Sequence, residues 1–209
     1  MKIGKKTISH YIARLATAIL THGYQPKSLL LATINSIPKN KRGNMCDASN
    51  YRGIALSSPV GKVLDKLFLW RNEQFLRTSD LQFAFKKQHG TTMCTAVVKS
   101  TVDYYLRYGS NVYSCLVDLT KAFDMVRFDR LFALLLKRGI SPVDIRALLD
   151  MYERQEIRTV WRNNFSNTFT ATNGIRQGSI ASPTLFTIYM DELLYKLESE
   201  GISCWHGLH

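Results

Sequence analysis

One carboxylate in the middle of the chain stands where a metal ligand would be useful. Asp118 directly follows residues 112–117, an apolar run that is typical of a buried β-strand. A hard oxygen ligand at the end of a strand can face a cleft and bind a divalent cation. The same aspartate could instead cap the turn that follows the strand. Its spacing alone leaves both interpretations open.

Further candidate residues lie in short polar loops far from Asp118 in the sequence. Lys39 opens a basic loop and Arg52 follows it, and an ammonium or guanidinium group there could hold phosphates. Gln177 and Gly178 form a turn in which glutamine offers a donor and an acceptor, and glycine lets the backbone approach a ligand closely. Taken singly, these residue types are also typical of ordinary solvated loops.

The elements that position these residues follow from hydrophobic periodicity and from capping signals. Helices are expected at residues 8–20, 59–75, 92–108, 128–138 and 182–197, with one more beginning at Pro142. Strands are expected from residue 29 towards Pro38 and at 112–117, and a β-hairpin at 157–161 and 165–172 with its turn at 162–164. Nothing in the sequence divides the chain, so we expect a single domain.

The composition favours a polyanionic partner. Among 209 residues, 28 Lys and Arg exceed 16 Asp and Glu, which gives a formal net charge of +12. Such a charge attracts nucleic acid first and an anionic membrane second, although a merely solubilising surface is a third interpretation.

The sequence predicts no membrane segment and no disulfide framework. No apolar run approaches the roughly 20 residues of a membrane span, and the N-terminus leads into a helical pattern rather than a signal peptide. We therefore expect an intracellular protein, with cytoplasm and nucleus both open. Cys46, Cys94, Cys115 and Cys204 are widely scattered, which favours free thiols.

The segment Asp-Leu-Thr-Lys-Ala-Phe-Asp at residues 118–124 resembles the first catalytic motif of reverse transcriptases from non-LTR retrotransposons and group II introns. The resemblance implies that Asp118 binds both catalytic metal ions and that the backbone carbonyl of Leu119 assists. It also implies that Phe123 lies under the incoming sugar and disfavours a ribose 2′-hydroxyl. For Asp124 we expect support of the turn rather than primary metal binding.

Two more blocks resemble the same family. Residues 174–183 are similar to the motif whose Gln-Gly pair, here Gln177 and Gly178, lines the nucleotide and template pocket. Residues 37–39 and 50–56 are similar to the fingers motif, which implies that Lys39 and Arg52 bind the triphosphate. Gly53 stands where many relatives have proline.

Residues 81–92 match a further family block more loosely, because Ala84 and Lys86 replace its usual glycine and arginine. The resemblance implies that Gln82, Phe85 and Lys86 lie near the template. A partly buried hairpin with basic edges is the alternative.

The second acidic motif of this family, an aromatic residue followed by one variable residue and two aspartates, has no counterpart in the chain, which contains no Asp-Asp pair. Tyr189 to Glu192 offers a similar pattern but lies within the helical period that follows Pro183. We therefore expect a chain truncated before this motif. Because two metal ions about 4 Å apart need two or three carboxylates, Asp118 alone is expected to be half of a metal site.

The resemblance covers about residues 25–205 and implies an α+β fold of the right-hand polymerase type. Residues 25–110 would form fingers and 111–209 a partial palm, with helices packed on a small antiparallel sheet and without the last palm strands and the thumb.

The implied function is template-directed DNA synthesis on RNA by a retrotransposon enzyme that uses two Mg²⁺ or Mn²⁺ ions, a DNA primer and dNTPs. One alternative is a truncated, non-catalytic remnant that at most binds nucleic acid and needs the missing palm and thumb or a partner. A viral-type RNA polymerase is another, against which Phe123 argues.

Overall fold

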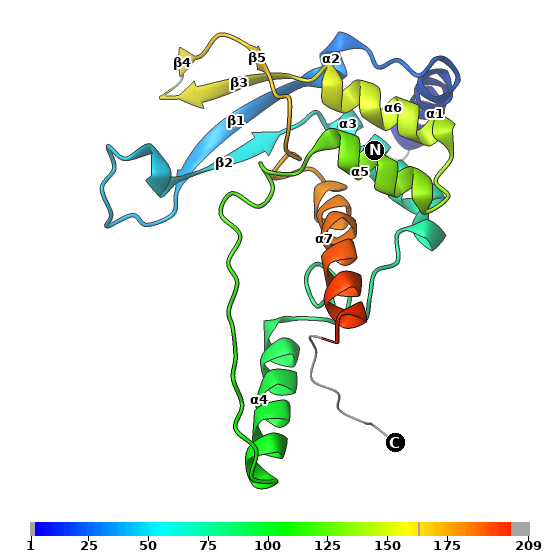
Figure 1. The fold of residues 1–209 in the computed structure, drawn as a ribbon. Helices are drawn as coiled ribbons and strands as arrows, with labels where there is room; N and C mark the ends of the chain where they lie inside the picture. Colours follow the sequence, from blue (N-terminus) through cyan, green and yellow to red (C-terminus); the bar gives the residue numbers. More distant parts are fainter. Residues whose placement is uncertain (1–2, 163, 202–209) are drawn as a thin grey trace.

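The computed structural model describes residues 3–162 and 164–201, which form an α+β fold (Figure 1). Its helices are α1 (Ile3–His22), α2 (Lys27–Leu30), α3 (Pro59–Arg71), α4 (Thr91–Arg107), α5 (Phe128–Lys137), α6 (Pro142–Glu153) and α7 (Ser182–Ser199). Its strands are β1 (Leu31–Pro38), β2 (Tyr51–Leu56), β3 (Glu156–Trp161), β4 (Asn164–Phe165) and β5 (Phe169–Thr170). Short 3-10 turns lie at Ala48–Asn50 and Glu73–Phe75.

The sheet is mixed, so the expectation of an antiparallel sheet is wrong. Its order is β2-β1-β3-β4, and β5 also pairs with β3. Strand β1 is antiparallel to β2 but parallel to β3, with Ile34 beside Thr159. The chain between β1 and β3 contains α3 to α6, and such a long helical crossover brings two strands together in parallel. The predicted hairpin is confirmed at β3 and β4, although its second arm is divided into β4 and β5.

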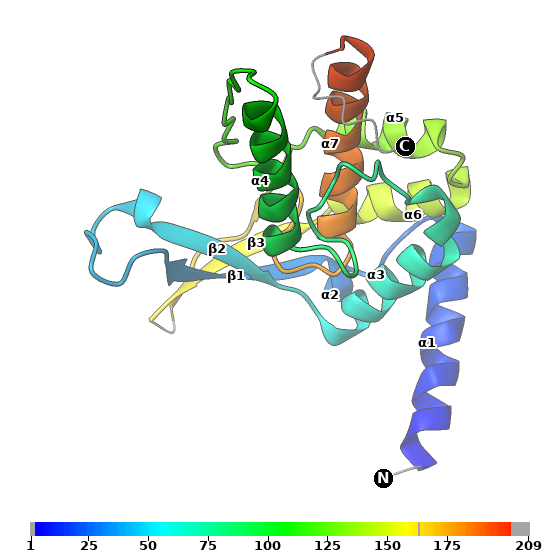
Figure 2. The same cartoon turned by 90° about the horizontal axis from the view of Figure 1, so that it is seen from below.

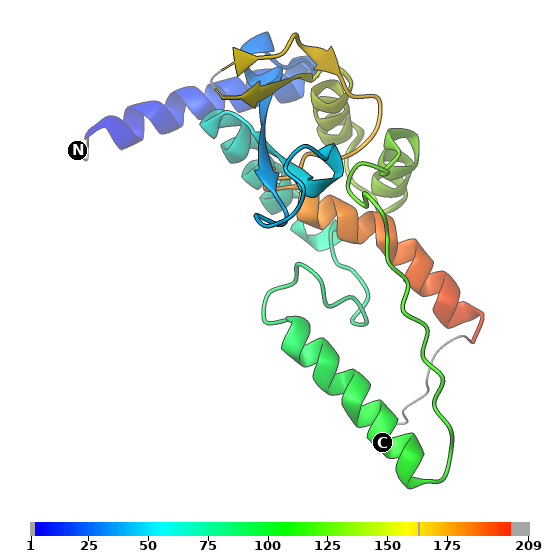
Figure 3. The same ribbon diagram turned by 90° about the vertical axis from the view of Figure 1, so that its left-hand side faces the viewer.

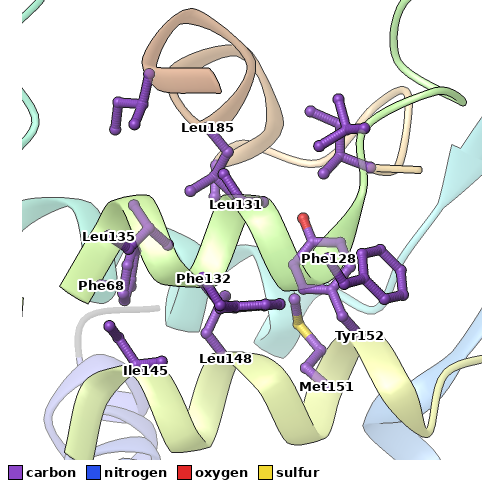
Figure 4. Packing of buried hydrophobic residues seen from close by; sticks show 14 of the residues in the cluster. Phe68, Phe128, Leu131, Phe132, Leu135, Ile145, Leu148, Met151, Tyr152 and Leu185 are labelled. Carbon is purple, nitrogen blue, oxygen red and sulfur yellow. The ribbon is translucent and has the colours of Figure 1, made fainter. Parts of the chain in front are cut away.

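The core lies among α5, α6 and α7. Leu131 and Leu135 of α5, Tyr152 of α6 and Leu185 of α7 are fully or almost fully buried (Figure 4). The amphipathic helix predicted at 128–138 buries Leu131, Leu134 and Leu135 and leaves Leu136 exposed. The cluster also contains Ile175, Ala181 and Leu185, so it packs against the loop before α7 and against the start of α7.

Capping residues set the starts of two helices. The Ser58 hydroxyl accepts a hydrogen bond of 3.0 Å from the Gly61 N–H, and Pro59 occupies the first turn of α3. Ser141 and Pro142 begin α6 in the same way. Both starts are confirmed, but α3 ends at Arg71, before the expected end at residue 75.

The predicted strand at residues 112–117 is wrong. These residues are extended but belong to no strand of the described chain, and the side chains of Tyr113, Leu116 and Val117 are 91%, 97% and 82% exposed. An apolar alternating pattern becomes a strand only beside a partner, and none of residues 3–162 and 164–201 supplies one here.

Helix α4, which precedes this extended segment, stands away from α5 and α6 (Figures 1 and 3). None of its residues 91–107 is buried. No helix in the described part of the chain has the length and apolar character to cross a membrane. Cys46, Cys94 and Cys115 are free thiols, as predicted, and Cys204 lies outside the described residues.

Candidate nucleotide-binding cleft

One cleft brings together residues that the sequence places in four separate segments. It is lined by the end of β1 and the loop after it, by β2, by residues 118–124, and by Gln177. The expected site residues in its wall are Lys39, Arg52, Asp118, Leu119, Phe123 and Gln177. Gly178 follows directly and shapes the loop behind the wall.

The Gln177–Gly178 turn is fixed against β2. The Ala55 N–H donates a 2.7 Å hydrogen bond to the Gln177 carbonyl. Gly178 has φ +107°, and a Cβ atom there would lie 2.6 Å from the Ala55 carbonyl oxygen. Only glycine accepts both the backbone conformation and this close approach. The turn therefore holds Gln177 at the edge of the cleft.

A second set of bonds joins this loop to the turn after Asp118. The Gly174 N–H donates to the Val126 carbonyl at 2.8 Å, and the Ile175 N–H donates to the Phe123 carbonyl at 2.9 Å. A Cβ at Gly174 would lie 3.0 Å from the backbone of Asp124. Residues 123–126 and 174–178 thus form one hydrogen-bonded layer.

Asp65 anchors the far end of the same loop, and the sequence analysis missed it. Its side chain is almost fully buried and accepts hydrogen bonds from the Ser179 hydroxyl at 2.6 Å and the Ile180 N–H at 3.1 Å. Asp65 and Phe68 are buried at helical spacing on one face of α3, and the buried Asn72 follows its end. An acidic residue on the buried face of an amphipathic helix is the sequence signal that indicates such a partner.

Phe123 is positioned by two other aromatic rings. It stacks on Phe186 of α7, with ring centroids 4.8 Å apart and an angle of 12° between the planes. The Phe85 ring meets it edge-on at 6.1 Å. Because stacked and edge-on contacts are both favourable, the half-buried Phe123 ring is held at the cleft from two sides.

Lys39 directly follows β1 and Arg52 lies on the adjacent β2, and both are exposed at the cleft. Arg52 is paired with Ile37 across β1 and β2, and Lys39 is two residues beyond Ile37. The Lys39 Nζ donates to the Ser49 carbonyl at 2.8 Å, while hydrogen bonds from Ser49 lower the pKa of the nearby Asp47.

Asn50 organises the basic loop between the two strands, a role that the motif alone did not assign. Its side-chain oxygen accepts from the Asn40 N–H at 3.0 Å, and its amide nitrogen donates to the carbonyls of Asn40 and Asn44 at 3.0 and 3.2 Å. Asn50 therefore fixes the loop that Lys39 opens.

Asp118 reaches the cleft from the exposed end of the extended segment, and Asp124 also lines the cleft. Carboxylates and the Leu119 carbonyl are the oxygen donors that Mg²⁺ or Mn²⁺ accepts. Within the described residues, however, no three acidic, histidine or cysteine side chains gather into a metal-binding group. The donor types fit a divalent cation, but the donor set falls short of what two ions need.

The predicted template block lies beside the cleft wall. Lys86 Nζ donates to the carbonyls of Thr78 and Ser79 at 3.0 and 2.5 Å, so this cation holds its own loop. Gln82 accepts from the Ala84 N–H at 3.3 Å. Only Phe85 of the three reaches a residue of the cleft, through its contact with Phe123. The template role of the block remains a prediction.

The Tyr189–Glu192 segment is helical, as predicted, and Asp191 has a structural partner. Its carboxylate is fully buried within α7, accepts from the Ser79 N–H at 2.8 Å and pairs with the Arg138 guanidinium at 2.5 Å. This aspartate ties α7 to α5 and to the loop before the template block. Asp191 is not among the residues that line the cleft, and its carboxylate is already engaged by Arg138 and Ser79.

Comparison with known families places this geometry in context. The profile described as reverse transcriptase (RNA-dependent DNA polymerase) matches residues 37–206. The chain is 28% identical over 187 residues to the RNA-directed DNA polymerase from mobile element jockey of Drosophila funebris, covering 88% of this chain and 20% of that protein.

Two other relatives come from Drosophila melanogaster. The putative 115 kDa protein in type-1 retrotransposable element R1DM is 27% identical, with 92% of this chain and 18% of that protein covered. The retrovirus-related Pol polyprotein from type-2 retrotransposable element R2DM is 24% identical, with 95% and 19% covered. The chain spans about a fifth of the length of these relatives.

The family match includes every cleft residue that the motifs indicated, from Lys39 to Gln177, and extends over most of the chain. The relatives are an RNA-directed DNA polymerase, a putative 115 kDa protein and a Pol polyprotein, all from non-LTR retrotransposons. The chain therefore belongs to the reverse transcriptase family, with its relatives among the non-LTR retrotransposons.

Proposed function

We propose that this chain forms the nucleotide-binding part of an enzyme that synthesises DNA on an RNA template by two-metal nucleotidyl transfer. The observation that carries the proposal is the convergence of cationic, aromatic, carboxylate and amide side chains in one cleft. The substrates would be a dNTP, a DNA primer and an RNA template, met inside the cell. Residues 25–110 would act as fingers and 111–209 as part of a palm.

Lys39 and Arg52 would bind the triphosphate. Both are exposed at the cleft, Lys39 just after β1 and Arg52 on β2, in a hairpin that is held by its register and loop bonds. A forked guanidinium can orient two phosphate oxygens, and a lysine adds a point charge for the leaving pyrophosphate.

Phe123 would select deoxynucleotides. Its ring lines the cleft and is braced by Phe85 and Phe186, so it cannot move aside without losing two aromatic contacts. A fixed ring under the sugar leaves no room for a 2′-hydroxyl. Gln177 would face the base pair, held there by the Gly178 turn.

Asp118 and the Leu119 carbonyl would hold a divalent cation, Mg²⁺ or Mn²⁺, which when bound supplies charge neutralisation and activation of the primer hydroxyl. Further carboxylates must join Asp118 before two ions can be held. These would come from additional palm chain or from a partner that also supplies a thumb.

A non-catalytic remnant that at most binds nucleic acid is the second candidate function. The observation in its favour is that Asp118 follows a segment of the described chain that is exposed and unpaired. On this alternative the cleft would bind nucleotide, but Asp118 would have no measurable role.

Nucleotide binding tests the cleft without requiring catalysis. We expect Lys39→Ala and Arg52→Ala each to weaken the binding of a fluorescent dNTP by about 10- to 100-fold, because each removes a charge-assisted contact. Arg107→Ala, an exposed arginine of α4, is the matched control. Equal dNTP affinities in all three variants would contradict the assignment of the phosphate ligands.

Primer extension tests the reaction. DNA synthesis on an RNA template would be measured for this chain alone and for the chain joined to the segment that follows the matched region in the jockey relative. We expect Mg²⁺-dependent synthesis by the joined protein, abolished by Asp118→Ala but not by Asp103→Ala on α4. No synthesis by the joined protein would count against the polymerase; synthesis by this chain alone would exclude the remnant.

A further inference from the structure

Two aromatic rings continue the wall of the cleft beyond the residues that the family motifs indicate. Tyr51 lines the cleft, and the Trp161 ring meets it edge-on with centroids 5.3 Å apart and an angle of 73° between the planes. Trp161 is 48% exposed although it is the last residue of a strand. The pair connects the start of β2, which follows the loop after β1, with the end of β3.

The strand register puts Trp161 on the same sheet face as Ile34 and Tyr51, two residues that line the cleft. Thr159 is beside Ile34, a cleft residue, and Trp161 is two residues further along the same strand. Alternate residues of a strand share a face, so Trp161, Thr159 and Ile34 point to one side. Tyr51 is paired with Pro38, which shares that face with Ile34.

The aromatic pair is held in place by the surrounding backbone. The Tyr51 hydroxyl donates to the Met45 carbonyl at 2.9 Å, and Trp161 is paired with Asn164 across the hairpin. The end of β3 and the loop between β1 and β2 project to the same side of the molecule (Figures 1 and 2). Little ordering is therefore needed before a flat ligand can stack there.

The charges around the pair suit a polyanion. Arg162 follows Trp161 directly and is exposed, and Lys39 and Arg52 line the same cleft as Tyr51. The ionised Asp47, whose pKa is lowered by Ser49, is the acidic residue of the adjoining loop. Lys39, Arg52, Lys121 and Arg162 are four cations in and beside the cleft, against the three acids Asp47, Asp118 and Asp124.

The neighbouring Phe165 provides a contrast within the same hairpin. It is paired with Val160 and so points to the opposite face of the sheet, where the Arg158 guanidinium lies 4.2 Å above its ring centroid. Phe165 thus already has a flat cationic partner. The exposed ring of Trp161 has the edge contact with Tyr51 and keeps surface open to solvent.

We propose that Tyr51 and Trp161 form a stacking platform for a base of the single-stranded RNA that leads into the cleft. Exposed aromatic rings bordered by cations bind single-stranded nucleic acid with little sequence preference, because every base has a π-face. The proposal deepens the proposed function, on which it rests, by assigning a surface to the unpaired template. Duplex would not fit this role, because its bases are already stacked.

Equilibrium binding of a labelled 12-nucleotide single-stranded RNA tests the platform. We expect Trp161→Ala to weaken binding by about 5- to 150-fold, the range for losing one stacked base. Trp70→Ala is the matched control, since Trp70 is a 73% exposed tryptophan of α3 that is outside the cleft. The dependence of affinity on salt should not change, because no phosphate contact is removed. Equal RNA affinities for the two variants would overturn the proposal.

A second comparison remains decisive if Trp161→Ala proves unstable. Trp161→Phe should keep RNA affinity within about threefold of the wild type while Trp161→Leu loses it, because stacking needs a ring of either kind. Equal affinity of the phenylalanine and leucine variants would exclude stacking. Since neither experiment needs catalysis, a platform that passes while primer extension fails would refute the polymerase alone, and the reverse result would refute the platform alone.

Discussion

The two sides of the cleft differ in how firmly packing and hydrogen bonds hold them. On one side, the loop of Gln177 and Gly178 is bonded to β2, to the turn at residues 123–126 and to the buried Asp65. On the other side, Asp118 follows a segment whose side chains at Tyr113 and Leu116 are more than nine-tenths exposed. Both sides carry family motifs, yet only one is embedded in packing and hydrogen bonds.

This difference separates two requirements of the proposed chemistry. The nucleotide side depends on contacts between segments of the described chain, and these contacts are present. The metal side depends on a strand that needs a neighbour, and the described chain offers none. The loop side of the cleft is therefore preorganised where the Asp118 side is not, and a catalytic metal site would need rigidly held ligands.

The largest effect that we expect comes from the buried ion pair of Arg138 and Asp191, which lies outside the cleft and joins α7 to the end of α5. Arg138→Ala should lower the free energy of unfolding by about 3–5 kcal/mol, because it leaves the fully buried Asp191 carboxylate without its partner. Urea denaturation measures the loss. Arg127→Ala, whose partner Asp129 is exposed, should change stability little. Similar losses in both variants would contradict a special role for the buried pair.

Gly178→Ala should have the next largest effect. Its Cβ would meet the Ala55 carbonyl at 2.6 Å in a left-handed backbone conformation, so we expect a loss of about 3 kcal/mol from steric conflict and backbone strain together. Gly109→Ala is the control, because Gly109 has φ +78° but open space around it after α4. Strain alone should cost about 1–2 kcal/mol there. Equal urea midpoints for the two variants would show that the contact with the Ala55 carbonyl adds no steric cost.

Asp65→Ala should cost about 2 kcal/mol, because the Ser179 hydroxyl and the Ile180 N–H lose a buried acceptor. Hydrogen exchange gives a sharper readout than stability. Peptides spanning residues 174–181 should exchange faster in this variant, whereas peptides of α4 should not change. Asp103→Ala on α4 provides the matched control. Unaltered protection of 174–181 would mean that Asp65 does not hold the loop.

The parts of the fold that local signals determine were predictable from the sequence. Ser58 with Pro59 and Ser141 with Pro142 mark helix starts because a hydroxyl cap and a fixed φ act within one turn. Helix α7 followed from its apolar period after Pro183. Strand β2 was not predicted as a strand, and the parallel pairing of β1 with β3 joins residues more than a hundred positions apart, which no local pattern contains.

The site residues likewise fall into those that the sequence indicated and those that it did not. Family motifs indicated Lys39, Arg52 and Gln177, and the fold brings them to one cleft. Asp65 and Trp161 were missed because their roles arise from contacts with Ser179 and Tyr51, which are distant in sequence. Motifs identify residues that meet a substrate, whereas the residues that position them become visible only in three dimensions.

The smallest effect on stability is expected from the extended segment before Asp118. Leu116→Ser should change the free energy of unfolding by less than about 0.5 kcal/mol, since the side chain is 97% exposed and has no packing to lose. Leu131→Ala in the core should cost about 2–5 kcal/mol in the same urea titration. Amides of residues 111–118 should also exchange rapidly, because they belong to no strand of the described chain. A large loss for Leu116→Ser, or slow exchange there, would mean that this segment is paired in solution, through self-association or a partner, and would remove the asymmetry between the two sides of the cleft.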